Sequence, residues 1–184
     1  MKEFYAELRR KNETTLATLR RELGGVRTGR ASISLLDGIT VEYYGTPTPL
    51  NQVATLLVPE PRLIVIQPWD ASLLKEIEKA IMRSDLGLTP VNDGRIIRVP
   101  IPPLTEERRK QLVKLVKKMA EDSKVAIRNV RREAIEQIRR REKEGELTED
   151  ELRKAQEEIQ KITDEYISKV DELLAVKERE ILEV

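Results

Sequence analysis

All nine prolines of this 184-residue chain lie between residues 29 and 104, and this distribution limits the possible folds more than any other feature. Proline disrupts a helix because it lacks a backbone N–H and its ring clashes with the preceding turn. The proline-free segments on either side repeat apolar residues at intervals of three and four, which is the spacing of one helix face. The sequence therefore predicts long helices on both sides of a module of a different kind.

The middle region has the pattern of a small α/β module. Strand-like runs, separated by glycines and prolines, occur at residues 39–44, 53–58, 63–66 and 96–101. One helix is predicted between them, over residues 71–85, with Asp70 or Ser72 as its N-cap. Trp69, just before this helix, is interpreted as a core residue.

Three long helices are predicted outside this module. The first spans about residues 2–28, although Gly24-Gly25 weakens its end. The second begins after Pro103 with Thr105 as N-cap and ends near Gly145. The third begins at a capping box, Thr148 to Glu151, and continues with an apolar seam of the coiled-coil type.

These elements predict an α+β fold in two parts. The three helices form an antiparallel up-down-up bundle from residues 1–30 and 105–184, and residues 31–104 form an inserted β/α/β domain. The chain crosses between the parts twice, and two adjacent strands can act as a hinge. The predicted hinge residues are Gly29, Arg30, Ala31, Leu104 and Thr105.

The chain contains no cysteine and no histidine, which restricts its chemistry. Disulfides and thiolate nucleophiles are excluded, and so are the commonest general base and metal ligand. We therefore expect a binding protein rather than an enzyme, with no cofactor and no metal. The N-terminus has no apolar targeting segment and no run is long enough to span a bilayer, so we expect a cytoplasmic protein without a membrane partner. We also expect the protein to be a monomer.

Charge is distributed unevenly along the second and third helices. Residues 108–141 carry 13 basic and 4 acidic side chains, whereas residues 142–184 carry 7 and 15. On a helical wheel the predicted buried face of the second helix consists of Leu112, Val116, Met119, Val130 and Ala134. A basic stripe lies beside this face and consists of Lys110, Lys117, Lys124, Arg128, Arg131, Arg132 and Arg139.

Two interpretations of the basic stripe remain open. It is either a solvated face, partly paired with the acidic third helix, or a surface that binds RNA. Its arginines favour RNA, because guanidinium groups suit bidentate contact with phosphate. Folded RNA is the better target than single strands, since only 3% of the residues are aromatic and stacking platforms are scarce.

Several segments resemble a known family in order along nearly the whole chain. They are VRTGRAS at 26–32, VEYYGTPTPLNQVA at 41–54, SDLGL at 84–88, PPLTEERRK at 102–110, VAIRNVRREA at 125–134 and ITDEYI at 162–167. Together they are similar to bacterial ribosome recycling factors. The resemblance implies a three-helix bundle with an inserted β/α/β domain on two hinge strands. It also implies binding to the ribosome after termination and, with elongation factor G and GTP, dissociation into subunits with release of mRNA and tRNA.

The same resemblance implies that certain residues bind ribosomal RNA of the large subunit. These are Arg109, Arg128 and Arg131, with Arg27 and Arg30 as weaker candidates. The position of the basic stripe on the wheel adds Arg132 and Lys117.

A coiled-coil RNA-binding scaffold or chaperone, which would bind proteins through its acidic third helix, is the main alternative. A hydrolase using Asp or Glu lacks a recognisable set of catalytic groups, and the chain has no phosphate-binding GxxxxGK loop. The Tyr43-Tyr44-Gly45 segment fits either half-buried strand packing or a contact with elongation factor G.

Overall fold

The computed structural model describes residues 1–183, which fold into two compact units. The first, the helical unit, is formed by Met1–Leu23 and Gln111–Arg179. The second, the sheet unit, is formed by Gly24–Lys110 and the C-terminal residues from Glu180 onwards. The domain boundaries predicted at 30/31 and 104/105 fall inside the sheet unit in this division.

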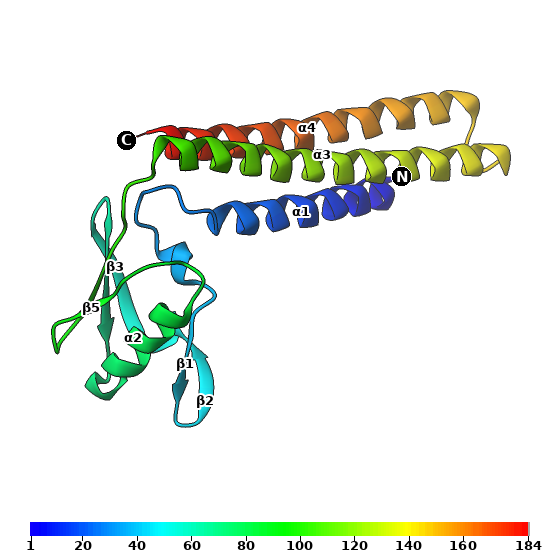
Figure 1. Cartoon of the computed structure of the whole chain (residues 1–184). Helices are drawn as coiled ribbons and strands as arrows, with labels where there is room; N and C mark the ends of the chain where they lie inside the picture. Colours follow the sequence, from blue (N-terminus) through cyan, green and yellow to red (C-terminus); the bar gives the residue numbers. More distant parts are fainter. Residues whose placement is uncertain (184) are drawn as a thin grey trace. The chain divides into compact units, whose positions relative to one another are not determined.

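Three helices build the helical unit: α1 (Lys2–Gly24), α3 (Glu106–Lys143) and α4 (Glu149–Leu182). Two contacts show that helices α3 and α4 run in opposite directions. Lys117 lies beside Glu178, whereas Arg131, later in α3, bonds to Gln160, earlier in α4. Figure 1 shows that α1 also runs antiparallel to α3. The predicted up-down-up bundle is therefore confirmed.

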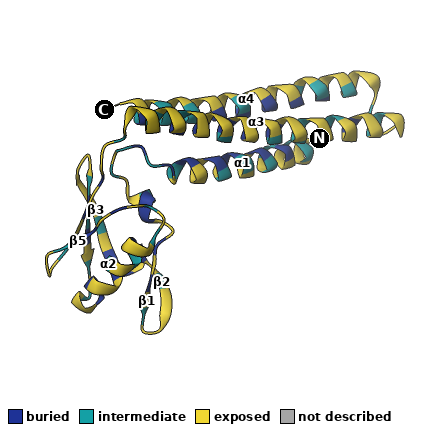
Figure 2. Ribbon diagram, viewed as in Figure 1, coloured by how far each residue is buried: buried dark blue, intermediate teal, exposed yellow. Residues whose placement is uncertain are grey.

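The apolar seams of these helices form the bundle core, and Figure 2 shows buried positions recurring along each helix. On α4 the predicted seam is confirmed, from buried Ala155 to buried Val170. The buried row of α3 is centred on Ala120 and Ile127 rather than on the predicted Met119, which is only half-buried. The difference arises because α3 packs against α1 and α4 at once, so the middle of its apolar face is covered most completely.

Local capping groups explain where the helices begin and end. The capping box at the start of α4 is confirmed: Thr148 N donates to Glu151 Oε1 and Glu151 N donates to Thr148 Oγ1, both at 3.1 Å. Thr105 caps α3, since its Oγ1 accepts from Arg108 N at 3.1 Å. Helix α1 ends at Gly24 rather than at the predicted residue 28, because Gly24 and Gly25 favour an irregular backbone.

The described residues of the sheet unit form six strands and one complete α-helix. Their bounds are β1 (Thr40–Tyr43), β2 (Thr46–Pro49), β3 (Ala54–Glu60), β4 (Leu63–Pro68), α2 (Leu74–Arg83), β5 (Val91–Asn92) and β6 (Ile97–Pro100). Strands β1 and β2 form a hairpin, and the other four form an antiparallel sheet in the order β3-β4-β6-β5. Alternate side chains of β4 and β6, such as Ile64 and Ile97, are fully buried in one core with Ile77 of α2. The predicted α+β class is confirmed.

Several local predictions for the sheet unit were wrong. Strand β2 was missed because its sequence, TPTP, contains two prolines, which sheets accept at an edge where a backbone N–H is not needed. The predicted helix is shorter, with a 3-10 turn at Ala71–Leu73 before α2. Trp69 is 67% exposed rather than in the core, and its indole N–H donates to Thr55 Oγ1 at 2.9 Å.

The two segments predicted as hinge strands meet at the turn between β3 and β4. Ala31 N donates to Pro61 O at 2.7 Å, and Ile101 N donates to Arg62 O at 2.8 Å. Gly29 has a φ of +81°, and a Cβ at this position would lie 3.3 Å from Leu104 Cγ. This close approach and the positive φ both favour glycine at residue 29.

No helix in the described part of the chain is long and apolar enough to cross a membrane.

Candidate nucleic-acid interface

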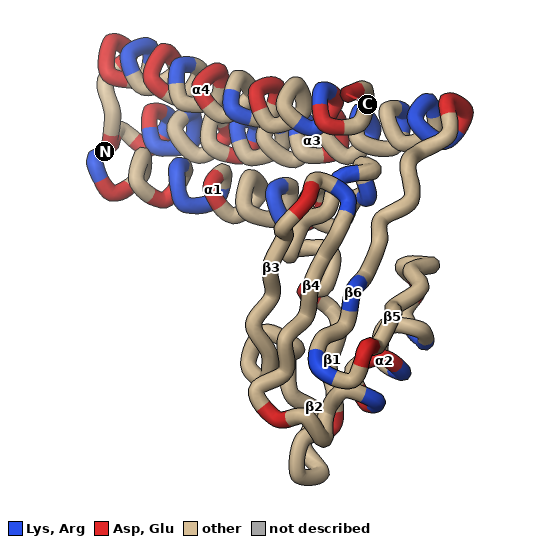
Figure 3. The backbone as a smooth tube through the Cα atoms, turned by 90° about the vertical axis from the view of Figure 1, so that its left-hand side faces the viewer, with Lys and Arg blue, Asp and Glu red and all other residues tan. Residues whose placement is uncertain are grey.

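The basic residues predicted for the interface within the helical unit lie along one flank of α3. The five residues Lys117, Lys124, Arg128, Arg131 and Arg132 fall within about 100° of one another around the axis of α3. Figure 3 shows that the bundle helices carry many basic and acidic positions, whereas the strands carry few. The structure therefore brings these five cations together on one surface.

The acidic helix α4 contacts the edge of this surface that lies nearest to it. Lys124 forms an ion pair with Asp171, and only 19% of the Lys124 side chain is exposed. Lys117 Nζ lies 4.0 Å from Glu178 Oε1, too far for a hydrogen bond, and this buried oxygen has no hydrogen-bond partner. Lys124 is thus mostly buried against α4, whereas the Lys117 ammonium group can still donate hydrogen bonds to a ligand.

Arg131 is held in place without losing its charge. Its Nε donates to Gln160 Oε1 at 2.7 Å, and Gln160 in turn donates to Asp164 Oδ1 at 2.8 Å. Because the acceptor is a neutral amide, the guanidinium remains uncompensated at its two terminal nitrogens. This contact fixes the direction of the side chain and leaves one edge of its planar fork for a phosphate group.

Arg128 and Arg132 are the most accessible arginines of the predicted set in the helical unit. Arg128 Nη1 lies 3.0 Å from Glu121 Oε1, but both side chains are more than half exposed. Exposed pairs of this kind contribute about 0–1 kcal/mol, so a phosphate can displace Glu121 at little cost. Arg132 is exposed and makes no ion pair with another residue of the described chain. Lys124 is therefore paired with the acidic helix, whereas Arg132 has no ion-pair partner among the described residues.

The remaining predicted residues, Arg27, Arg30 and Arg109, belong to the sheet unit. Arg27 Nη1 donates to the Leu86 carbonyl at 3.3 Å, and its Nε is buried without a partner. Arg30 Nη2 donates to Glu183 Oε2 at 2.7 Å. Arg27 is therefore turned towards its own unit, whereas Arg30 is neutralised locally by a carboxylate.

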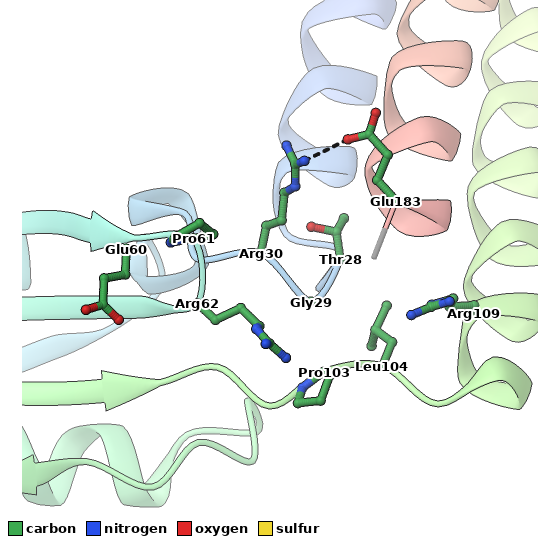
Figure 4. Close-up of a pocket in the computed structure, with 10 residues that line it drawn as sticks. All are labelled: Thr28, Gly29, Arg30, Glu60, Pro61, Arg62, Pro103, Leu104, Arg109 and Glu183. Carbon is green, nitrogen blue, oxygen red and sulfur yellow. Dashed lines mark hydrogen bonds and ion pairs between the residues drawn. The ribbon is translucent and has the colours of Figure 1, made fainter.

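Arg30 and Arg109 line one cavity of about 420 Å³, which is drawn in Figure 4. Its walls come from the segment around Gly29, the turn between β3 and β4, Leu104 and the first turns of α3. Arg62 also lines this cavity. Arg62 carries no sequence signal of its own, because a single arginine after Pro61 belongs to no periodic pattern or motif. The fold brings it beside residues that are more than forty positions away in the chain.

The described residues contain no group of three or more His, Cys, Asp or Glu side chains that could hold a metal ion.

Comparison with known proteins decides the family. A family model described as ribosome recycling factor matches residues 19–182. The chain belongs to the ribosome recycling factor family. Its membership confirms the resemblance noted in the sequence and agrees with the prediction of a binding protein rather than an enzyme.

Individual relatives match over almost the full length. The ribosome-recycling factor of Desulfatibacillum aliphaticivorans is 59% identical over 179 residues, covering 97% of each chain. That of Bacillus licheniformis is 57% identical over 178 residues, covering 97% of this chain and 96% of the relative.

Solved structures of ribosome recycling factors share the fold as well. A solution structure has a TM-score of 0.82 and 44% identity, with 100% of this chain and 97% of the other covered. The T. thermophilus factor, described together with E. coli elongation factor G bound to the E. coli post-termination complex, has a TM-score of 0.70. It is 54% identical, and 98% of each chain is covered. A ribosome recycling factor of this fold is thus described as bound to the post-termination complex.

Proposed function

We propose that this chain binds the large subunit of the post-termination ribosome and, with elongation factor G and GTP, promotes dissociation into subunits with release of mRNA and tRNA. The observation that carries the proposal is a match of 98% of the chain, in both sequence and fold, to a factor described with elongation factor G on the post-termination complex. This activity takes place in the cytoplasm, where ribosomes translate.

Within this function, the surface of α3 provides the contact with ribosomal RNA. Arg128, Arg131 and Arg132 present guanidinium groups that are exposed or bonded only to neutral or weakly held partners. Lys117 adds a charge at the same surface. Folded RNA suits this arrangement, because the phosphate groups of a duplex follow a line rather than a single point.

The sheet unit contributes a further contact through Arg109, whereas Arg27 bonds to Leu86 and Arg30 would first have to leave Glu183. The hinge between the bundle and the inserted domain consists of two connecting segments. One contains Gly29, Arg30 and Ala31, and the other contains Leu104 and Thr105. The close approach of Gly29 to Leu104 supports this assignment, because the two connecting segments lie side by side outside the strands of the sheet. Elongation factor G would act by moving the inserted domain about these strands.

The alternative of a scaffold or chaperone would require the acidic helix α4 to be the binding surface. Glu165 instead bonds to Arg9 of α1 at 2.8 Å, and Asp171 pairs with Lys124 of α3. The Arg9 guanidinium lowers the pKa of Glu165, chiefly through this hydrogen bond, which keeps the carboxylate charged. Part of the acidity of α4 is therefore used to hold the bundle together, which favours recycling over the alternative.

A ribosome-splitting assay tests the proposal directly. Purified post-termination ribosomes are mixed with elongation factor G and GTP, with and without this protein, and subunit formation is followed by light scattering. We expect splitting only in the complete mixture, and little with a non-hydrolysable GTP analogue. Splitting that proceeds equally without the protein would contradict the proposed function.

The residues are tested in the same assay with substituted proteins. Arg128→Ala combined with Arg131→Ala should raise the protein concentration needed for half-maximal splitting. Reversing the charge of Glu172, an exposed residue of α4, serves as the matched control and should have little effect. The opposite ranking would favour the scaffold alternative.

A further inference from the structure

We propose that the cavity lined by Arg30, Arg62 and Arg109 is a phosphate-binding site, in which Arg62 and Arg109 hold the phosphate oxygens. Only the biological source of that phosphate, the RNA backbone, rests on the proposed function. The recognition chemistry depends on the cavity alone. Arg62 is thereby assigned a role that neither the sequence pattern nor the basic stripe indicates.

The charges around this cavity are unbalanced in favour of an anion. Arg30 is compensated by Glu183, whose Oε2 accepts from it at 2.7 Å. Neither Arg62 nor Arg109 forms a side-chain hydrogen bond or an ion pair with another described residue. Glu60 is the remaining carboxylate of the lining, and Figure 4 shows it pointing away from both arginines. Two guanidinium groups are therefore left without a counter-charge.

Arg109 also carries a polar atom that lacks a partner. Its Nε is buried and makes no hydrogen bond in the described structure. This atom is covered by protein, so a ligand in the cavity would be held by the terminal nitrogens of the Arg109 guanidinium group. Figure 4 shows the side chains of Arg62 and Arg109 extending towards each other across Leu104 and Pro103. An anion placed between them could accept hydrogen bonds from both.

The walls of the cavity are held by backbone contacts rather than by the arginines themselves. The Arg62 carbonyl accepts from Ile101 N at 2.8 Å, and the neighbouring Pro61 carbonyl accepts from Ala31 N at 2.7 Å. These bonds fix the backbone of the turn that carries Arg62, which lowers the entropy lost when this turn contributes to binding. Two guanidinium forks match the several acceptor oxygens of a phosphate better than a single point charge does.

The volume of about 420 Å³ is large for an isolated phosphate ion but suits a phosphate that is attached to sugar groups. The cavity opens among polar residues, and Thr28 adds a hydroxyl group to its wall. Both a free phosphate ion and an RNA backbone phosphate therefore share the required chemistry. The size favours the phosphodiester of RNA.

The test uses the full chain with nitrogen-15 in its arginines, so that the Nε–Hε signals of Arg62 and Arg109 are observed by NMR. One sample is titrated with inorganic phosphate and another with a short RNA duplex. We expect both signals to shift and to saturate in each titration. Arg62→Gln should weaken the affinity obtained from the Arg109 signal by about tenfold, since a charge-assisted hydrogen bond is lost.

Arg95→Gln is the matched control, because Arg95 is an exposed arginine of the same unit outside the cavity. It should change the affinity less than twofold, as judged by the same signal. Tighter, salt-dependent binding of the duplex assigns the site to RNA, whereas equal or tighter binding of inorganic phosphate assigns it to the free ion. Either result supports a phosphate site.

The proposal is overturned if the Arg62 and Arg109 signals stay unchanged in both titrations, or if Arg95→Gln weakens binding as much as Arg62→Gln. The ribosome-splitting assay separates this failure from failure of the proposed function. Normal splitting by a protein whose arginine signals do not respond would remove the cavity site and leave the recycling activity standing.

Discussion

The salt dependence of ribosome binding offers the sharpest test of which α3 cations contact RNA. Each Lys or Arg that neutralises a phosphate on a duplex releases counterions and adds a slope of about −0.9 to the plot of log K against log salt. The predicted slope is about −3.6 for the four accessible cations, or roughly 150-fold weaker binding when salt rises fourfold. These cations are Lys117, Arg128, Arg131 and Arg132. Arg132→Ala removes one such contact and should bring the slope of the helical unit to about −2.7, or roughly 40-fold.

Lys124→Ala provides the matched control, because it removes the same single charge from the same helix. Lys124 is paired with Asp171 and its side chain is only 19% exposed, so it is not free to contact phosphate. We expect its slope to remain at the wild-type value. Any contribution of the sheet unit steepens all slopes equally and cancels in the comparison.

The measurement is fluorescence anisotropy of labelled protein with purified large subunits, at constant magnesium and increasing potassium chloride. The reasoning is refuted if Arg132→Ala leaves the slope unchanged. It is also refuted if Lys124→Ala flattens the slope as much as Arg132→Ala does, because burial and ion pairing would then not determine which cations bind.

Three further predictions concern stability, each measured by urea denaturation. Gly29→Ala should lower the free energy of unfolding by about 1–2 kcal/mol. The loss should exceed that of Gly87→Ala, because both residues have positive φ but only Gly29 also approaches Leu104. Equal losses for the two variants would contradict this. Asn12→Val should raise the free energy of unfolding by about 1 kcal/mol, since the Asn12 amide is fully buried and neither of its polar atoms has a partner; a less stable variant would contradict this. The pKa of Asp93 is lowered from 3.8 to about 2, chiefly by backbone N–H groups of its own turn. Its contribution to the free energy of unfolding is therefore present above the unfolded pKa and is lost as pH falls towards about 2. Asp93→Asn should flatten this acid-induced loss, and parallel plots of unfolding free energy against pH for the two proteins would refute the assignment.

Sequence reasoning succeeded where local chemistry determines structure. The start of α4 depends on the reciprocal bonds of Thr148 and Glu151, which lie three residues apart, so the pattern is visible without a tertiary fold. The apolar seams gave the bundle for the same reason, since helix periodicity is a property of the segment itself.

It failed where the answer depends on distant partners. Strand β2 exists because Thr46–Pro49 pairs with β1, a contact that outweighs the low strand propensity of its two prolines. Trp69 was placed in the core because tryptophan is usually buried, yet Thr55 on the neighbouring strand holds its indole at the surface. Arg62 was missed because the cavity that it lines is assembled from four separated segments.

The same distinction governs the candidate RNA site. A helical wheel treats Lys124 and Arg132 as equivalent members of one stripe, because it contains no information about α4. The structure separates them, since Asp171 holds Lys124 while Arg132 stays exposed. With a formal net charge of only +1, the whole chain has little general attraction for RNA. Binding must therefore depend on where the uncompensated cations are placed, and the acidity of α4 sharpens that placement by neutralising the cations nearest to it.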